Sequence, residues 1–232
     1  MPPELFRIRT VWIGCAILFI SFFQVVALSV LVPYGMQTLD NIGPDQAALQ
    51  LIAFSLAIPF GAFISGRWML HSGRYKPLQL VGTGMLPLAM LLLAWLGPHA
   101  TQATSVALAV AGVATGMTMP TSLVAVQNAV PHRNIGIATA MTALFRSMGG
   151  AVGVAVLSSI LFAMLHADAG TALAEGGART VVQASATAAS TAFRITLLCG
   201  AIVSLLAHVL AWMIPEQSLR AGAPAATESA KA

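Results

Sequence analysis

Few polar side chains in the apolar part of this chain could take part in chemistry. Arg146 is the one charged residue well inside a long apolar stretch, and Gln24 lies in the middle of another. Arginine presents five N–H donors and keeps its proton at any usable pH, so Arg146 can bind an acceptor but cannot relay a proton. At helical spacing Arg146 shares a face with Thr142. We predict that a substrate cavity or gate is lined by Arg146, Gln24, Thr142 and Phe23.

Arg146 and Gln24 could instead have a purely structural role. Arg146 lies about 11 residues from the end of its stretch, so its side chain could extend to the interface or tie helix ends together through carbonyl groups. Gln24 could simply hydrogen-bond a neighbouring helix.

Motifs for enzymatic chemistry are missing from the sequence. There is no His-Glu-x-x-His pair, no Gly-x-Ser-x-Gly elbow and no phosphate-binding glycine loop followed by Lys. The five His residues are dispersed, and the two cysteines lie in different apolar stretches. We therefore predict a protein that is not an enzyme, with no catalytic residue, no metal site and no cofactor.

Six long apolar stretches must position these side chains. They cover 11–32, 47–65, 77–96, 105–126, 135–165 and 195–214. About 20 apolar residues can cross the hydrocarbon core of a bilayer as a helix. Every backbone amide in lipid must be paired internally, so helices are the only sensible structure for such stretches. The sequence predicts an all-α, polytopic membrane protein with six transmembrane helices, none of which contains Asp or Glu.

Charged residues amount to only 8% of the chain, against 58% hydrophobic residues. Eight Lys and Arg fall on one side of the predicted spans, and Arg179 and Arg194 on the other. The eight are Arg7, Arg9, Arg67, Arg74, Lys76, Arg133, Arg220 and Lys231. Basic residues favour the cytoplasmic side, so both termini are expected there. These dispersed residues do not form the stripe typical of nucleic-acid binding, and no nucleic-acid partner is predicted.

The predicted organisation has three parts. A cytoplasmic N-terminal segment covers 1–10, a six-helix transmembrane domain covers 11–214, and a disordered cytoplasmic tail covers 215–232. Within the domain, the connector 166–190 is rich in Ala, Gly, Ser and Thr and is predicted to be a loose, weakly helical loop on the outer side.

Small residues recur at helical spacing in the fourth and fifth stretches, and close helix approach in lipid depends on such residues. The fifth stretch also carries a ridge formed by Ser147, Ala151, Ala155 and Ser159. We predict helix packing, or else a moving hinge, at Gly112, Gly116, Pro120, Gly149, Gly150 and Gly153.

The turn after the second stretch reads Gly-Arg-Trp-Met-Leu-His-Ser-Gly-Arg-Tyr-Lys from residue 66. It resembles the loop signature of the major facilitator superfamily, Gly-x-x-x-Asp-Arg-x-Gly-Arg-Arg, as found in the second half of those transporters. Gly66, Gly73 and Arg74 match this cytoplasmic loop motif. Leu70 and His71 stand where the family has Asp and Arg, so the charge relay attributed to the loop lacks its acidic member.

Three further segments look like the fourteen-span drug/proton antiporters of the EmrB/QacA type. They are 3–7, 112–120 and above all 128–153, with Asn-Ala-Val-Pro-His-Arg-Asn-Ile-Gly-Ile-Ala-Thr-Ala followed by Arg-Ser-Met-Gly-Gly-Ala-Val-Gly. The similarity covers only the last six spans of such a transporter. It implies one half of a major-facilitator-type bundle, alternating access between two halves, and proton coupling through carboxylates that lie mainly in the other half.

The expected function is therefore transport: the C-terminal half of a proton-coupled multidrug-type efflux transporter, incomplete and inactive alone. The expected partners are the lipid bilayer, an N-terminal half-transporter or a second copy, and a small amphipathic or hydrophobic substrate. The expected location is a bacterial inner membrane. Two alternatives are a non-transporting assembly or regulatory module, and a homodimerising six-span transporter.

Overall fold

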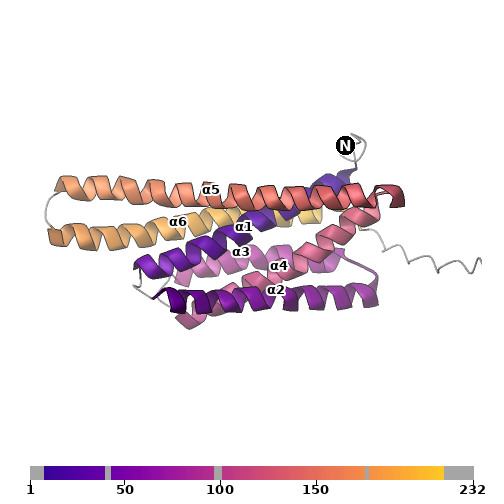
Figure 1. The fold of residues 1–232 in the computed structure, drawn as a ribbon, viewed down its shortest axis with the longest axis horizontal. Coiled ribbons are helices and arrows are strands. Elements are labelled where there is room, and N and C mark those ends of the chain that lie inside the picture. Colours follow the sequence, from indigo (N-terminus) through magenta and orange to yellow (C-terminus); the bar gives the residue numbers. More distant parts are fainter. Residues whose placement is uncertain (1–7, 40–42, 97–100, 176–177, 217–232) are drawn as a thin grey trace, which may run out of the picture.

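The computed structural model describes residues 8–39, 43–96, 101–175 and 178–216, which form six long helices (Figure 1). The helices are α1 (Arg9–Leu39), α2 (Pro44–Ser72), α3 (Lys76–Leu96), α4 (Thr101–Ala129), α5 (Ile135–Glu175) and α6 (Ala178–Trp212), and a 3-10 turn, η2 (His132–Asn134), precedes α5.

All six helices are long and apolar enough to cross a membrane. The prediction of an all-α, polytopic membrane protein with six spans is confirmed. Most helices extend beyond the predicted apolar cores, because their ends are favoured locally, whereas α6 ends at Trp212, two residues before the predicted end. In α2, Pro44 occupies the first turn, where no backbone N–H is needed, and Gly73 closes the other end.

The prediction of a loose, weakly helical loop over 166–190 is wrong about the loop, because most of this segment is helical. Helix α5 continues to Glu175 and α6 begins at Ala178, so the two helices occupy most of the segment that was predicted to be a loop. The physical reason is the high helix propensity of Ala and the absence of Pro from this segment. The terminal segment 1–7 and most of the predicted tail, 217–232, lie outside the described residues.

The helices pack mainly in pairs. Helix α2 lies against α4, α1 against α5, and α3 against both α4 and α6. The starts of α1, α3 and α5 lie at one end of the bundle (Figure 1). We call this the basic end, because it carries Arg9, Arg74 and Arg133.

Buried side chains form one large cluster in the half away from the basic end, which includes Leu28, Leu86, Leu108 and Leu197. Two smaller clusters fill the basic end, one around Ile13 and the other around Cys15. Large apolar side chains also cover the outside of several helices, as expected where acyl chains rather than water are the solvent.

Candidate functional site

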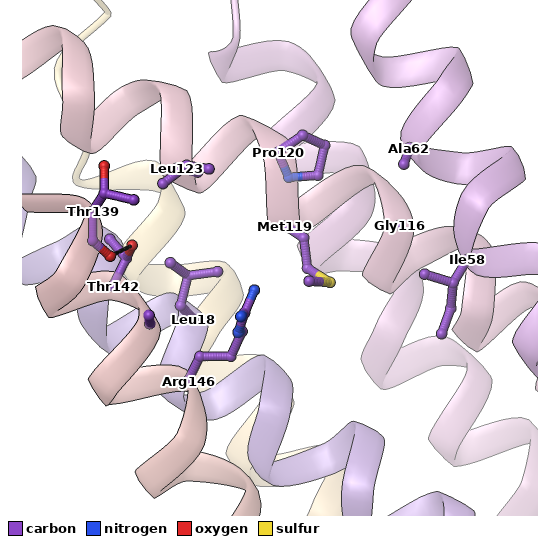
Figure 2. A pocket seen from close by; sticks show the side chains of 11 residues that line it. Leu18, Ile58, Ala62, Gly116, Met119, Pro120, Leu123, Thr139, Thr142 and Arg146 are labelled. Carbon is purple, nitrogen blue, oxygen red and sulfur yellow. Dashed lines mark hydrogen bonds between the residues drawn. The ribbon is translucent and has the colours of Figure 1, made fainter. Parts of the chain in front are cut away.

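A pocket of about 350 Å³ lies between α1, α2, α4 and α5 (Figure 2). Its lining residues are Leu18, Ile58, Ala62, Gly116, Met119, Pro120, Leu123, Thr139, Thr142, Ala143 and Arg146. Two of the four predicted cavity residues, Arg146 and Thr142, are therefore brought together on α5. Their spacing of four residues is one helical turn, which is why the sequence pattern could pair them.

The α2 wall of the pocket is held close to α4 by glycine. A Cβ atom at Gly116 would collide with the carbonyl oxygen of Ile58, and one at Gly112 would collide with that of Phe54. Gly61 makes the reciprocal contact with the backbone of Val113. Pro120 lies one turn further along α4 and lines the pocket.

A second glycine seam joins α5 to α1. A Cβ atom at Gly149 would collide with the carbonyl oxygen of Phe19, and one at Gly153 with that of Phe23. A Cβ atom at Gly150 would lie 2.9 Å from a methyl group of Val26. Because Arg146 precedes this seam by less than one turn, the seam fixes its position beside α1.

The Arg146 guanidinium extends into the pocket, towards Leu18 and Met119 in the view of Figure 2. Its central carbon lies 5.1 Å from the centre of the Phe22 ring on α1, a cation–π contact. No described side chain or carbonyl accepts a hydrogen bond from the guanidinium, and no described carboxylate forms an ion pair with it. Its N–H donors are therefore available to a ligand.

The hydroxyl protons of the two threonines in the pocket are donated to backbone carbonyl groups. Thr142 donates to the carbonyl oxygen of Thr139 (2.7 Å), and Thr139 donates to that of Ile135 (2.9 Å). The hydroxyl oxygen of Thr139 accepts a hydrogen bond from the side-chain amide of Gln127 on α4 (2.9 Å). Sequence reasoning missed Gln127, which stands just past the predicted end of its stretch and ties α4 to α5.

Gln24 and Phe23 lie away from the pocket. Gln24 is fully buried, and its amide nitrogen donates to the carbonyl oxygen of Gly200, which ties α1 to α6. Phe23 belongs to the large buried cluster and presents its backbone to Gly153.

The loop motif closes α2 at the basic end. Gly73 has a φ of 65° and donates its N–H to the Met69 carbonyl (3.0 Å), so glycine suits this left-handed position. Arg74 pairs with Glu216, their side-chain atoms 3.5 Å apart at an exposed site. Gly66 lies within α2, and a Cβ atom there would meet no neighbour within 4 Å.

Another polar group links α3 to α6 and was not singled out in the sequence. The Thr83 hydroxyl donates to the Gln79 carbonyl (2.7 Å) and lies 3.1 Å from Nδ1 of His208. Trp212 donates to Nε2 of the same ring (3.2 Å). These contacts suit a neutral imidazole with its proton on Nδ1. Among the described side chains, no group of three His, Cys, Asp or Glu could hold a metal ion.

Six membrane-crossing helices and an amphipathic pocket between four of them define the class as a polytopic helical membrane protein. Residues 14–232 match the model of the Major Facilitator Superfamily, and the chain belongs to this superfamily.

Several relatives carry names that describe export or resistance. The chain is 30% identical to a tetracycline resistance determinant of Streptomyces rimosus over 71% of its own length and 48% of the relative's. It is 30% identical to an MFS-type efflux transporter, phmH, of Phaeosphaeria nodorum over 69% of the chain and 28% of that protein. It is 26% identical to multidrug resistance protein Stp of Mycobacterium tuberculosis, over 72% and 31%. The chain thus spans about half or less of each relative.

Proposed function

We propose that this chain is the C-terminal half of a proton-coupled efflux transporter of the fourteen-span EmrB/QacA type, and that its pocket is one wall of the substrate path. The observation that carries the proposal is Arg146, a charged donor with no hydrogen-bond or ion-pair partner among the described residues, in a pocket formed by four membrane-crossing helices. The names of its relatives, which describe efflux or drug resistance, also support a role in export.

The exposure of the helices supports the proposal that another half-bundle covers this face. In α2 and α5, only 22% and 28% of the most apolar part of the span is buried, against 39% to 61% in the other four helices. The ridge formed by Ser147, Ala151, Ala155 and Ser159 is exposed along α5. Small residues of this kind let a partner helix approach closely.

Proton coupling would depend on the partner half. None of the six predicted spans contains Asp or Glu, and Arg146 cannot release its proton. The carboxylates that carry protons would therefore belong to the other half, with both termini of this chain in the cytoplasm of a bacterial cell.

We expect Arg146→Ala to abolish efflux when the chain is expressed together with the half that completes it. The substitution removes the only charged donor of the pocket, so substrate binding or gate closure should fail. Efflux of a fluorescent drug is measured in cells, and membrane abundance is checked by immunoblot. Arg133→Gln, outside the pocket, is the matched control. Normal efflux by the Arg146 variant would remove Arg146 from the site.

A non-transporting assembly module would need a face for its partner, and the faces of Gly112 and Ala151 are the two candidates. The Gly112 face is covered by the α2 backbone, whereas Ala151 is exposed, so only the α5 face could bind a regulatory partner. The adjacent DNA discriminates the two functions. A reading frame encoding the preceding eight spans supports the transporter half, and an unrelated neighbourhood supports the module.

A further inference from the structure

The pocket has a strongly one-sided charge. Arg146 is the only ionisable group among its eleven lining residues, and its guanidinium has no hydrogen-bond or ion-pair partner among the described residues. The two acidic side chains that the structure describes are remote. Asp45 stands at the start of α2, away from the basic end, and Glu216 is paired with Arg74.

Arg146 is exposed in this structure, so a ligand can reach its side chain. A charge beside apolar walls in a membrane needs a countercharge or acceptors, and the described part of the protein supplies neither. The Thr139 and Thr142 hydroxyl protons are given to backbone carbonyls, so they do not compete with Arg146 for an acceptor. The contact with Phe22 uses the face of an aromatic ring and occupies none of the five N–H donors in a hydrogen bond.

The remaining walls are hydrophobic. Leu18, Ile58, Met119, Pro120 and Leu123 line the rest of the pocket and offer a flexible apolar surface to a ring system. A planar guanidinium fork pairs best with two oxygens of one acidic group. A ligand that satisfies both parts of the pocket has an apolar aromatic body and an anionic oxygen group.

We propose that this pocket selects amphipathic anions, meaning aromatic molecules that carry a carboxylate, sulfonate or ionised enol, over neutral and cationic molecules of the same size. This substrate class rests on the proposed function, in which the pocket is part of the transport path. Lipophilic cations meet only repulsion from Arg146 on this wall.

The test uses the full chain in nanodiscs of zwitterionic phosphatidylcholine and two dyes with the same ring system. Anilinonaphthalene sulfonate is anionic, and N-phenylnaphthylamine lacks the sulfonate. Both fluoresce more strongly in apolar surroundings, and the signal from empty nanodiscs is subtracted. The proteins compared are the wild type, Arg146→Gln, Arg146→Lys, Arg133→Gln and Ala143→Trp. Circular dichroism confirms that each variant is folded.

The sulfonate should bind the wild type at least about ten-fold more tightly than it binds Arg146→Gln, a difference of about 1.4 kcal/mol. Arg146→Lys should recover part of this affinity, because it restores the charge without the planar fork. The neutral dye should bind the wild type, Arg146→Gln and Arg133→Gln equally. Ala143→Trp, which fills the pocket, should weaken both dyes.

Two failures can be told apart. If Ala143→Trp weakens both dyes but Arg146→Gln leaves sulfonate affinity unchanged, the pocket binds ligands and the charge selection is overturned. If Ala143→Trp affects neither dye, the pocket is not a ligand site. Both the proposal that it forms part of the substrate path and the proposal that it selects anions are then overturned.

Discussion

Arg146 and Gln24 are polar side chains within apolar helices, and their surroundings differ. Gln24 is fully buried and gives its amide proton to a carbonyl on α6. Arg146 finds an aromatic face but no acceptor among the described residues. Gln24 is enclosed between helices, where an amide that joins two of them suits a structural role, whereas the exposed Arg146 keeps N–H donors that a ligand can reach. The two residues should therefore respond differently to substitution.

Gln24→Met should leave dye affinity in the pocket unchanged and alter stability only slightly. The side chains have similar volumes, and a hydrogen bond between helices in lipid is worth about 0.6 kcal/mol on average. The Gly200 carbonyl also accepts from the Ser204 hydroxyl (3.0 Å), so it keeps a side-chain partner. The measurements are dye titration and thermal unfolding in nanodiscs. A loss of dye affinity as large as that of Arg146→Gln would show that Gln24 does contribute to ligand binding in the cavity.

At the scale of helices, two glycine seams define the pocket. One joins α2 to α4 at Gly112 and Gly116, and the other joins α1 to α5 at Gly149 and Gly153. Each seam lets one backbone touch another, so the helices cannot separate without losing dispersion contacts. The pocket is the space left where the two pairs meet.

Gly116→Ala should destabilise the bundle by about 1 to 3 kcal/mol, the usual effect of overpacking. Its new methyl group would meet the Ile58 carbonyl, which is backbone and cannot rotate away. Gly136→Ala adds the same methyl group at a position with no atom within 4 Å and should change stability by less than about 0.5 kcal/mol. Thermal unfolding of both variants compares them directly. Equal melting temperatures would mean that the α2–α4 seam is not tight.

The sequence was most informative where one physical effect dominates. Hydropathy alone located six spans, and a spacing of four residues paired Arg146 with Thr142. It was less informative about which neighbour a residue meets. Phe22, not Phe23, contacts Arg146, because adjacent helix positions differ by about 100° in direction. That direction has meaning only once α1 is placed against α5, which a single sequence does not specify.

In the described bundle, the outer sides of α2 and α5 are the least covered by other helices. The pocket lies between α2 and α5, the two least buried spans, and α5 exposes its ridge of small residues there. A lone six-helix bundle would present Arg146 to lipid, where a charge is costly by at least about 2.5 kcal/mol. A partner on this face would remove that cost and complete the pocket.

The purified chain alone should therefore not transport. In liposomes with an imposed pH gradient, we expect no gradient-dependent movement of anilinonaphthalene sulfonate or ethidium, because the six predicted spans contain no carboxylate to carry protons and one wall cannot alternate access. Movement should appear when the completing half is reconstituted with it.

Cross-linking tests the alternative in which two copies of this chain pair to form the transporter. Ala155→Cys on the open face, in a chain with Cys15 and Cys199 replaced by Ser, should give no homodimer, and Ile202→Cys on the exposed side of α6 is the matched control. A specific Ala155→Cys homodimer together with transport by the chain alone would establish the six-span homodimer instead.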